Sequence, residues 1–159
     1  MRTATDLRES SPLEMAIAGG RPVLLATLGV RLEEAATVFA IDTAVEDGRS
    51  LIIVNVTRLE PLSLSVRLGY DALEELTPEV SRSMRRSAGL ALSLGLRVER
   101  LRVRSPRPVT ALLELVAERG PGVLVFGPDR AAIGIHTYRR SVRRIREANP
   151  CLVWTAEQA

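Results

Sequence analysis

The chain has 159 residues, 46% of them apolar and 26% charged, which is long enough for one domain with a sizeable core and too short for two ordinary domains. All 22 basic side chains are arginine, which excludes the lysine-dependent phosphate loop and Schiff-base chemistry. One histidine, His136, and one cysteine, Cys151, are too few for a Cys/His metal site or an internal disulfide.

The sequence predicts a cytoplasmic protein that makes no membrane contact. No stretch approaches the roughly eighteen continuous apolar residues of a membrane span, and the N-terminal residues have no apolar core of the kind found in signal peptides. Residues 1–20 mix charged and small side chains and end in two glycines, which predicts a flexible arm with one helical turn around Leu13–Ala18. A single domain is expected over residues 21–159.

Short apolar runs after Pro22 predict strands. Four of them are continuous, as is typical of parallel strands that are buried on both faces: VLLATL (23–28), SLIIVNV (50–56), GVLVFG (122–127) and CLVWTA (151–156). The run LRVERLRVR (96–104) nearly alternates apolar and charged residues but slips in phase at Glu99–Arg100, which predicts a half-exposed edge strand with a bulge. Residues 57–77 give mixed signals.

Helical patterns lie between these runs. They predict helices over 31–48, 77–95, 105–120 and 136–148, the first three of which end at glycines suited to C-caps. Strands that alternate with helices of this length predict an α/β fold, an open doubly wound parallel sheet with helices on both faces. Ligands of such folds bind outside the carboxyl ends of the strands, where the strand order reverses.

This layout resembles the universal stress protein family from Arg21 to Trp154. The similar pieces are VLLATLG, LIIVNV, NPCLVW and the block GLRVERLRVRSPRPVTALLELVAERGPGVLVFG (95–127), which carries most of the likeness because its elements occur in family order. The resemblance implies a five-stranded, Rossmann-like sheet of the adenine nucleotide alpha hydrolase type, with strand order 3-2-1-4-5. It also implies a homodimer through Leu152 to Thr155 and a role in stress adaptation or signalling.

The nucleotide-binding motifs of that family are altered in this chain. Family members that bind nucleotides end the first strand with aspartate, glycine and serine, and Leu28, Gly29 and Val30 stand at those positions here. The ribose-binding carboxylate of the family is therefore missing.

The family signature after the fourth strand is glycine, two residues, glycine, nine residues, then glycine with serine or threonine. On this chain it falls on Gly127, Arg130, Arg140 and Ser141, and a shift by one residue instead puts Arg139 and Arg140 in the last two places. Arginine in place of glycine blocks the approach of backbone N–H groups to a phosphate, but its guanidinium fork can bind phosphate oxygens bidentately.

Two functional hypotheses follow from these substitutions. In the first, the usual ATP site is lost or altered, and the domain acts through dimerisation and a protein partner. In the second, ATP or another adenine nucleotide binds with Arg130 and Arg140 as substitute phosphate ligands. The family positions that complete such a site are Gly29, Val56, Gly127, Ser141 and Val142. The sequence leaves open whether the two arginines point into the pocket.

The last helix, YRRSVRRIREA, has one apolar face formed by Tyr138, Val142 and Ile145. Its arginines are interpreted as a solvated face or a partner surface that includes Arg143 and Arg144, because the net charge of +3 and the few aromatic residues do not favour nucleic acid.

An enzyme of ordinary type is not expected, because the sequence shows no combination of nucleophile and acid–base groups. The nucleotide-binding hypothesis allows at most slow hydrolysis of the nucleotide. His136 and Ser141, five residues apart on a helix, do not face one another. Cys151 is expected to be a packed, unreactive thiol, and Asp129 is expected to pair with Arg130 across the turn.

Overall fold

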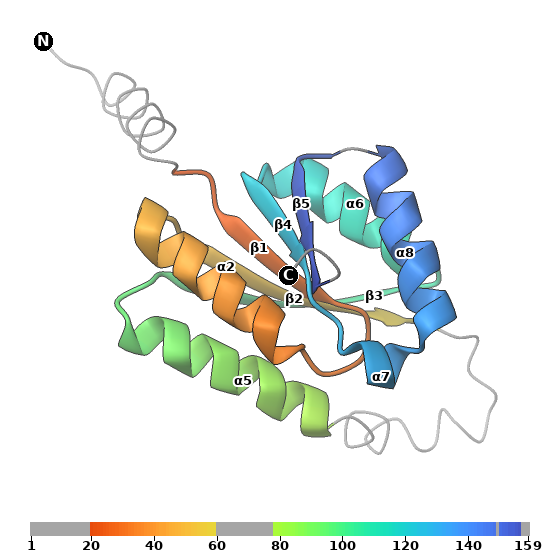
Figure 1. The fold of residues 1–159 in the computed structure, drawn as a ribbon, viewed down its shortest axis with the longest axis horizontal. Coiled ribbons are helices and arrows are strands. Elements are labelled where there is room, and N and C mark those ends of the chain that lie inside the picture. Colours follow the sequence, from red (N-terminus) through yellow and green to blue (C-terminus); the bar gives the residue numbers. More distant parts are fainter. Residues whose placement is uncertain (1–19, 60–77, 149, 157–159) are drawn as a thin grey trace, which may run out of the picture.

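The computed structural model describes residues 20–59, 78–148 and 150–156, and its centre is a sheet of five parallel strands (Figure 1). The strands are β1 (Val23–Thr27), β2 (Leu51–Arg58), β3 (Val98–Ser105), β4 (Val123–Phe126) and β5 (Leu152–Thr155). Their order is β3-β2-β1-β4-β5, so the direction of winding reverses between β1 and β4. The predicted fold class and the strand order implied by the resemblance are confirmed.

Helices cover both faces of the sheet. They are α2 (Glu34–Asp47), α5 (Pro78–Ser93), α6 (Pro108–Arg119), α7 (Arg130–Ile133) and α8 (Ile135–Ala148). Helices α2 and α5 lie on one face, and α6 and α8 lie on the other (Figure 1). The predicted C-caps of α2 and α6 are confirmed, since Gly48 and Gly120 adopt left-handed φ angles of 64° and 58°. The short helix α7 was not predicted.

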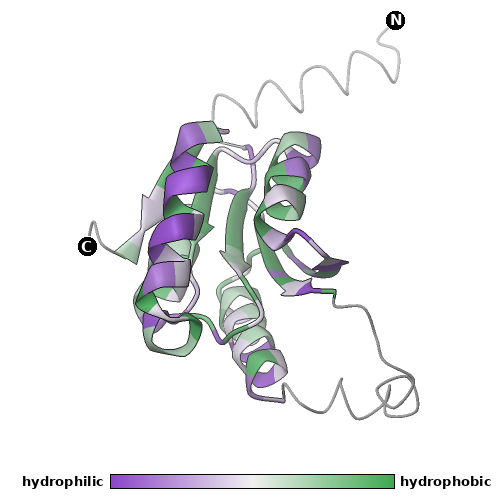
Figure 2. Cartoon of the chain, turned by 90° about the vertical axis from the view of Figure 1, so that its right-hand side faces the viewer, coloured by the Kyte–Doolittle hydropathy of each residue, from purple (hydrophilic) through white to green (hydrophobic). Residues whose placement is uncertain are grey.

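The sheet separates two hydrophobic cores, because side chains alternate between its faces. Leu25 and Ile53 face α2 and α5, whereas Leu24, Val54 and Phe126 face α6 and α8. The strands are accordingly hydrophobic between helices that carry their polar residues outward (Figure 2). The predicted apolar face of α8 is confirmed, because Tyr138, Val142 and Ile145 are all buried.

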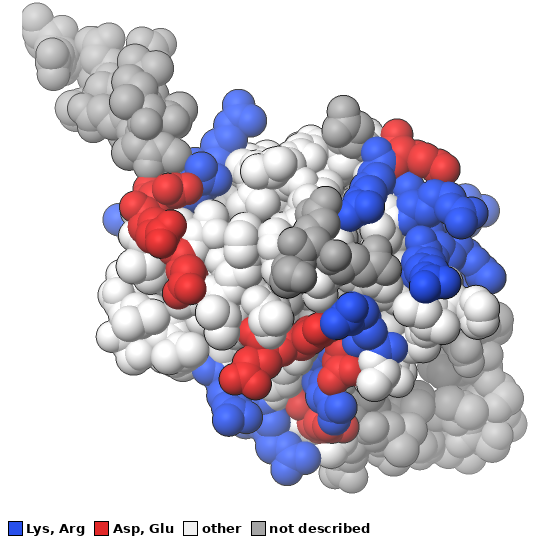
Figure 3. Space-filling view, in the orientation of Figure 1, with Lys and Arg blue, Asp and Glu red and all other residues white. Residues whose placement is uncertain are grey.

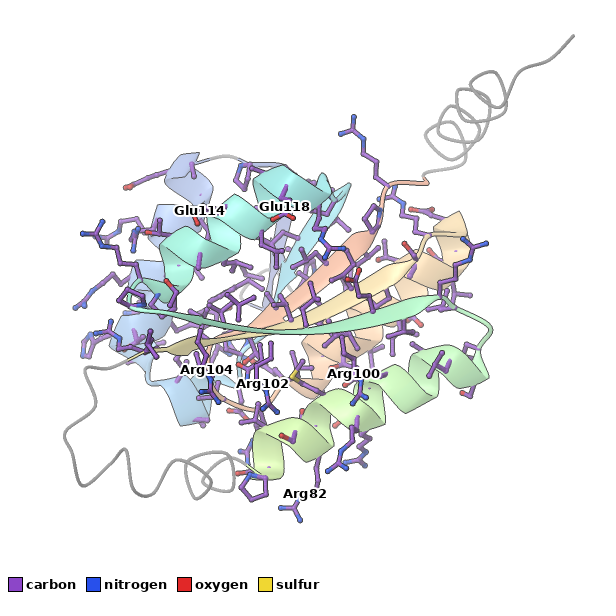
Figure 4. All side chains as sticks on the ribbon, turned by 180° about the vertical axis from the view of Figure 1, so that it is seen from behind. Arg82, Arg100, Arg102, Arg104, Glu114 and Glu118 are labelled. Atoms are coloured by element: carbon purple, nitrogen blue, oxygen red, sulfur yellow. The ribbon has the colours of Figure 1, made fainter. Side chains whose placement is uncertain are left out.

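The predicted bulge in β3 is wrong. Residues Val98–Ser105 pair one to one with Leu51–Arg58 and leave no extra residue. The phase slip instead marks a change of buried face along an edge strand. Val98 packs toward α2 and α5, whereas Leu101 and Val103 pack toward α6 and α8. On the α5 side, the later positions of β3 carry arginines that include Arg100 and Arg102 (Figure 4).

Three sequence predictions concern residues outside or at the edge of the described ranges. The expected arm lies almost entirely outside them, as does its helical turn at 13–18. The uncertain stretch 57–77 is described only at its start, where β2 continues to Arg58. None of the described helices is long and apolar enough to cross a membrane.

Candidate functional site

A cavity of about 280 Å³ lies at the carboxyl ends of β1 and β2, where they meet the start of α6 and the α7–α8 segment. Its lining comes from all of these elements: Leu28, Val56, Arg58, Pro106, Arg107, Pro108, Val109, Ile133, Thr137, Arg140, Ser141 and Arg144. This end of a doubly wound sheet, beside the strand reversal, is the usual position of a ligand site.

Three of the seven predicted site residues line this cavity, namely Val56, Arg140 and Ser141. The other four, Gly29, Gly127, Arg130 and Val142, do not line it. Of the two arginines whose direction the sequence left open, one lines the cavity and the other does not. Arg140 contributes to the cavity wall, whereas Arg130 reaches across to α2 and forms a 3.1 Å ion pair with Glu33.

Gly127 has a packing role in this structure. A Cβ atom at this position would lie 2.7 Å from the Cβ of Ala36 and 3.0 Å from Cδ1 of Leu25. The Gly127 carbonyl also accepts a hydrogen bond from the backbone N–H of Glu33 at 2.8 Å. The missing side chain thus allows the start of α2 to approach the end of β4.

The turn after β1 is held by a buried amide that the sequence analysis did not single out. The backbone N–H of Gly29, which has a φ of 73°, donates to Oδ1 of Asn55 at 2.8 Å. Asn55 lies in β2 and is only 4% exposed, so this buried hydrogen bond holds the loop after β1 against the neighbouring strand. A lone asparagine in the otherwise apolar run LIIVNV was the signal that could have identified it.

The backbone phosphate cradle of the family signature is not formed at Arg140 and Ser141. Helix α8 already begins at Ile135, which places both residues in its second turn. Backbone N–H groups at that depth bond within the helix, and only those of the first turn are available to an anion. Any anion in the cavity is therefore contacted by side chains from α8.

The loops on the α2 side of this edge are electrostatically paired. Arg31 donates to Oδ2 of Asp129 at 2.6 Å and to Oε1 of Glu79 at 2.7 Å, and Arg130 pairs with Glu33. The expected ion pair between Asp129 and Arg130 is therefore wrong. Asp129 instead caps α7 through two backbone N–H groups of its first turn. The hydrogen bond from Arg31 lowers the pKa of Asp129 and raises the pKa of Arg31 itself.

The cavity on the α8 side carries excess positive charge. Four arginines line it, Arg58, Arg107, Arg140 and Arg144, and no carboxylate appears among its described lining residues. In the described part of the chain, none of these four guanidinium groups makes an ion pair, although that of Arg144 donates to Oγ1 of Thr110 at 2.9 Å. Figure 3 shows the contrast between basic side chains gathered over α8 and mixed charges near α7.

The start of α6 adds to this positive potential. Its N-cap residue, Arg107, makes no side-chain capping bond, and proline follows in the first turn. Uncapped first-turn N–H groups carry the positive end of the helix dipole. Arg58, Arg107 and Arg144 were not among the predicted site residues, because their proximity depends on how β2, α6 and α8 pack together.

A larger groove of about 530 Å³ lies on the outer side of α8, and its lining includes Val142, Arg139 and Arg143. All of its described lining residues belong to α8, so the described part of the chain does not supply the convergent walls that a small-molecule site needs. The groove also separates two residues that were expected to act together: Arg143 lines it, whereas Arg144 lines the cavity.

The remaining chemically notable residues form no second site. His136 is exposed in the first turn of α8, and no group of three metal-ligating side chains exists among the described residues. Cys151 is a half-buried free thiol, and its burial raises its pKa, which agrees with the expected low reactivity.

Comparison with solved structures shows a shared fold, whereas no family model and no curated protein matches the sequence. A universal stress family protein from Burkholderia pseudomallei matches with a TM-score of 0.60 and 19% identity, over 85% of this chain and 94% of that one. A universal stress protein in complex with cAMP matches with a TM-score of 0.60 and 20% identity, over 86% of this chain and 96% of that one. The universal stress protein UspA from Lactobacillus plantarum matches with a TM-score of 0.61 and 13% identity, over 86% of this chain and 97% of that one. The chain therefore has the universal stress protein fold.

Proposed function

We propose that this domain acts in stress adaptation or signalling and that its nucleotide site is altered: guanidinium groups, in place of a backbone cradle, bind the phosphates of an adenine nucleotide. The observation that carries this proposal is the cavity at the strand carboxyl ends, which four arginines line and no described carboxylate does. A protein of the same fold is described in complex with cAMP, which supports an adenine nucleotide as the ligand.

Guanidinium groups suit this role chemically. Arginine presents planar pairs of N–H donors that match phosphate oxygens, and a hydrogen bond to a charged group contributes about 1.5–3 kcal/mol. Like charges that line one small cavity also repel each other, so a bound polyanion relieves that repulsion as well as forming new contacts. Arg144 is already held against α6 by Thr110 and is thus partly preorganised for such a ligand.

Thermal-shift measurements with ATP, ADP, AMP and cAMP test this function. At a ligand concentration of about 100 times Kd, stabilisation is about 2.7 kcal/mol, which raises Tm by about 5–11 °C for a chain of this size. Arg140→Ala should weaken binding about 10–100-fold because it removes one charge-assisted contact. Arg139→Ala is the matched control, because its side chain lines the outer groove on the same helix. The absence of any shift at millimolar nucleotide would refute the proposal.

Dimerisation through β5 is a second proposed activity, as the family resemblance implies. Strand β5 pairs with β4, and Leu152 on it is 73% exposed. An exposed apolar edge strand is a template for pairing with another chain. Trp154, two residues later on the same strand, stacks on Phe39 of α2 with a distance of 4.6 Å between ring centroids, which holds this strand against α2. The proposed occupant is β5 of a second copy.

We also propose a cytoplasmic location. The support is compositional, because a sequence with a single cysteine cannot form an internal disulfide and fits a reducing compartment.

A further inference from the structure

The cavity has a charged wall and an apolar floor, and they indicate different affinities for the two ends of a nucleotide. The charged wall comes from three separate elements: Arg58 from β2, Arg107 from the start of α6, and Arg140 with Arg144 from α8. The acidic residues of α6, Glu114 and Glu118, lie on later turns of that helix and point outward (Figure 4). The described lining therefore carries positive charge that no described carboxylate of the lining offsets.

The nucleoside end finds much less complementarity. The side chains that line the floor are mostly apolar and include Leu28, Val56, Val109 and Ile133. Among the described residues of the lining there is no Asp, Glu, Asn or Gln, and the side-chain hydroxyls are those of Thr137 and Ser141. Ribose hydroxyls buried against leucine would lose water without gaining a carboxylate acceptor, and an unpaired buried polar group is costly.

The size of the cavity points the same way. At about 280 Å³ it falls just below the range of about 300–1,000 Å³ typical of sites for whole small-molecule ligands. A cavity at this lower limit suits a compact group, and the part of a nucleotide that it matches in charge is the phosphate chain.

We infer that this cavity selects the polyphosphate chain and not the nucleoside, so that its ligand class is compact polyphosphates in general, inorganic tripolyphosphate included. This inference rests on the proposed phosphate-binding function and specifies what that site recognises. It makes Arg58 and Arg107 phosphate ligands beside Arg140, and it makes Leu28 the residue that removes nucleoside selectivity.

The test is calorimetric titration of the full chain with ATP, dATP, GTP, inorganic tripolyphosphate and adenosine. Divalent cations are omitted and ionic strength is held constant, so that guanidinium groups alone neutralise the phosphates. Tripolyphosphate is expected to bind at least as tightly as ATP, with dATP and GTP within about threefold of ATP and no binding of adenosine.

Two outcomes separate this inference from the function on which it rests. ATP binding more than about tenfold tighter than both GTP and tripolyphosphate, or measurable binding of adenosine, would overturn the inference alone. The absence of binding by every phosphate compound would overturn both the inference and the proposed function.

Substitutions in the cavity provide a second readout. Arg107→Ala and Arg58→Ala should each weaken the binding of ATP and of tripolyphosphate by the same factor, about tenfold. The factor is the same because the replaced arginine contacts phosphate in both ligands. Leu28→Asp should weaken tripolyphosphate more than ATP, since the new carboxylate repels phosphate but can accept from ribose hydroxyls. An unchanged ratio of the two affinities in a folded Leu28→Asp variant, checked by circular dichroism, would contradict the assignment of Leu28.

Discussion

Replacement of Gly127 by alanine tests whether the first glycine of the altered signature serves packing or ligand binding. The added methyl carbon would lie 2.7 Å from Cβ of Ala36 and 3.0 Å from Cδ1 of Leu25. Favourable carbon–carbon contacts lie at about 3.5–4.0 Å, so the start of α2 would have to move outward by roughly 1 Å. That movement is resisted by the 2.8 Å hydrogen bond from the Glu33 N–H to the Gly127 carbonyl.

The expected cost follows from this overlap. Overpacking in a well-packed core costs about 1–3 kcal/mol, and for a domain of this size each kcal/mol lowers Tm by about 2–4 °C. Gly127→Ala should therefore lower Tm by about 2–12 °C in differential scanning calorimetry. Gly89→Ala is the matched control, because a Cβ there meets nothing within 4 Å. This exposed position in α5 should gain about 0.5–1 kcal/mol from helix propensity.

The assay has a second arm, because a phosphate cradle and a packing contact predict different results. If Gly127 serves packing, the variant should bind tripolyphosphate with unchanged affinity well below its Tm, since the residue does not line the cavity. Loss of tripolyphosphate binding in a variant with unchanged Tm would refute this reasoning and would indicate that Gly127 is part of the ligand site.

The remaining predictions concern the α7 cap and the β5 edge. Asp129→Ala should cost about 1 kcal/mol at pH 7 through loss of the N-cap. Because Arg31 lowers the pKa of Asp129, this contribution is complete above about pH 4 and is lost as the pH falls through the lowered pKa. The difference in free energy of unfolding between wild type and variant, measured by denaturant unfolding, should therefore disappear in acid. Leu152→Asp should convert a dimer to a monomer in sedimentation velocity, whereas Leu92→Asp, at a similarly exposed leucine of α5, should not. A difference in unfolding free energy that does not change with pH would contradict the prediction for Asp129. A wild-type protein that is already monomeric would contradict the prediction for Leu152.

The sequence was sufficient for most of the fold because the strand signal is strong. Runs such as VLLATL and SLIIVNV are buried on both faces, and that pattern admits few alternatives to a parallel sheet between helix layers. The phase slip in β3 was recognised but misinterpreted, because a one-dimensional pattern cannot distinguish an extra residue from a change of buried face. That distinction depends on the register with β2 and on which core each side chain of β3 enters, and both are tertiary properties.

The site was less predictable for a related physical reason. Alignment with the family signature placed Arg130 and Arg140 as equivalent substitutes for glycine, but α7 and the early start of α8 give the two residues different directions. Arg130 belongs to the four-residue helix α7, where Glu33 is within reach, and Arg140 lies in the second turn of α8, which packs against α6. Arg58 and Arg107 could not be placed at all from spacing, because they come together only through the order of β2 and β3 and the start of α6.

The distribution of carboxylates separates the described arginines at the strand ends into a paired set and a set that we propose binds ligand. On the α2 side of the strand ends, Arg31 and Arg130 each have a carboxylate partner within 3.1 Å. On the α8 side, the arginines of the cavity line a space that contains none among the described residues. Basic residues that serve only as a solvated surface have no reason to be sorted in this way between two neighbouring loops. An exchange of charge should therefore act differently on the two sides: Arg31→Glu should lower stability and leave phosphate binding intact, whereas Arg140→Glu should abolish phosphate binding and leave stability intact.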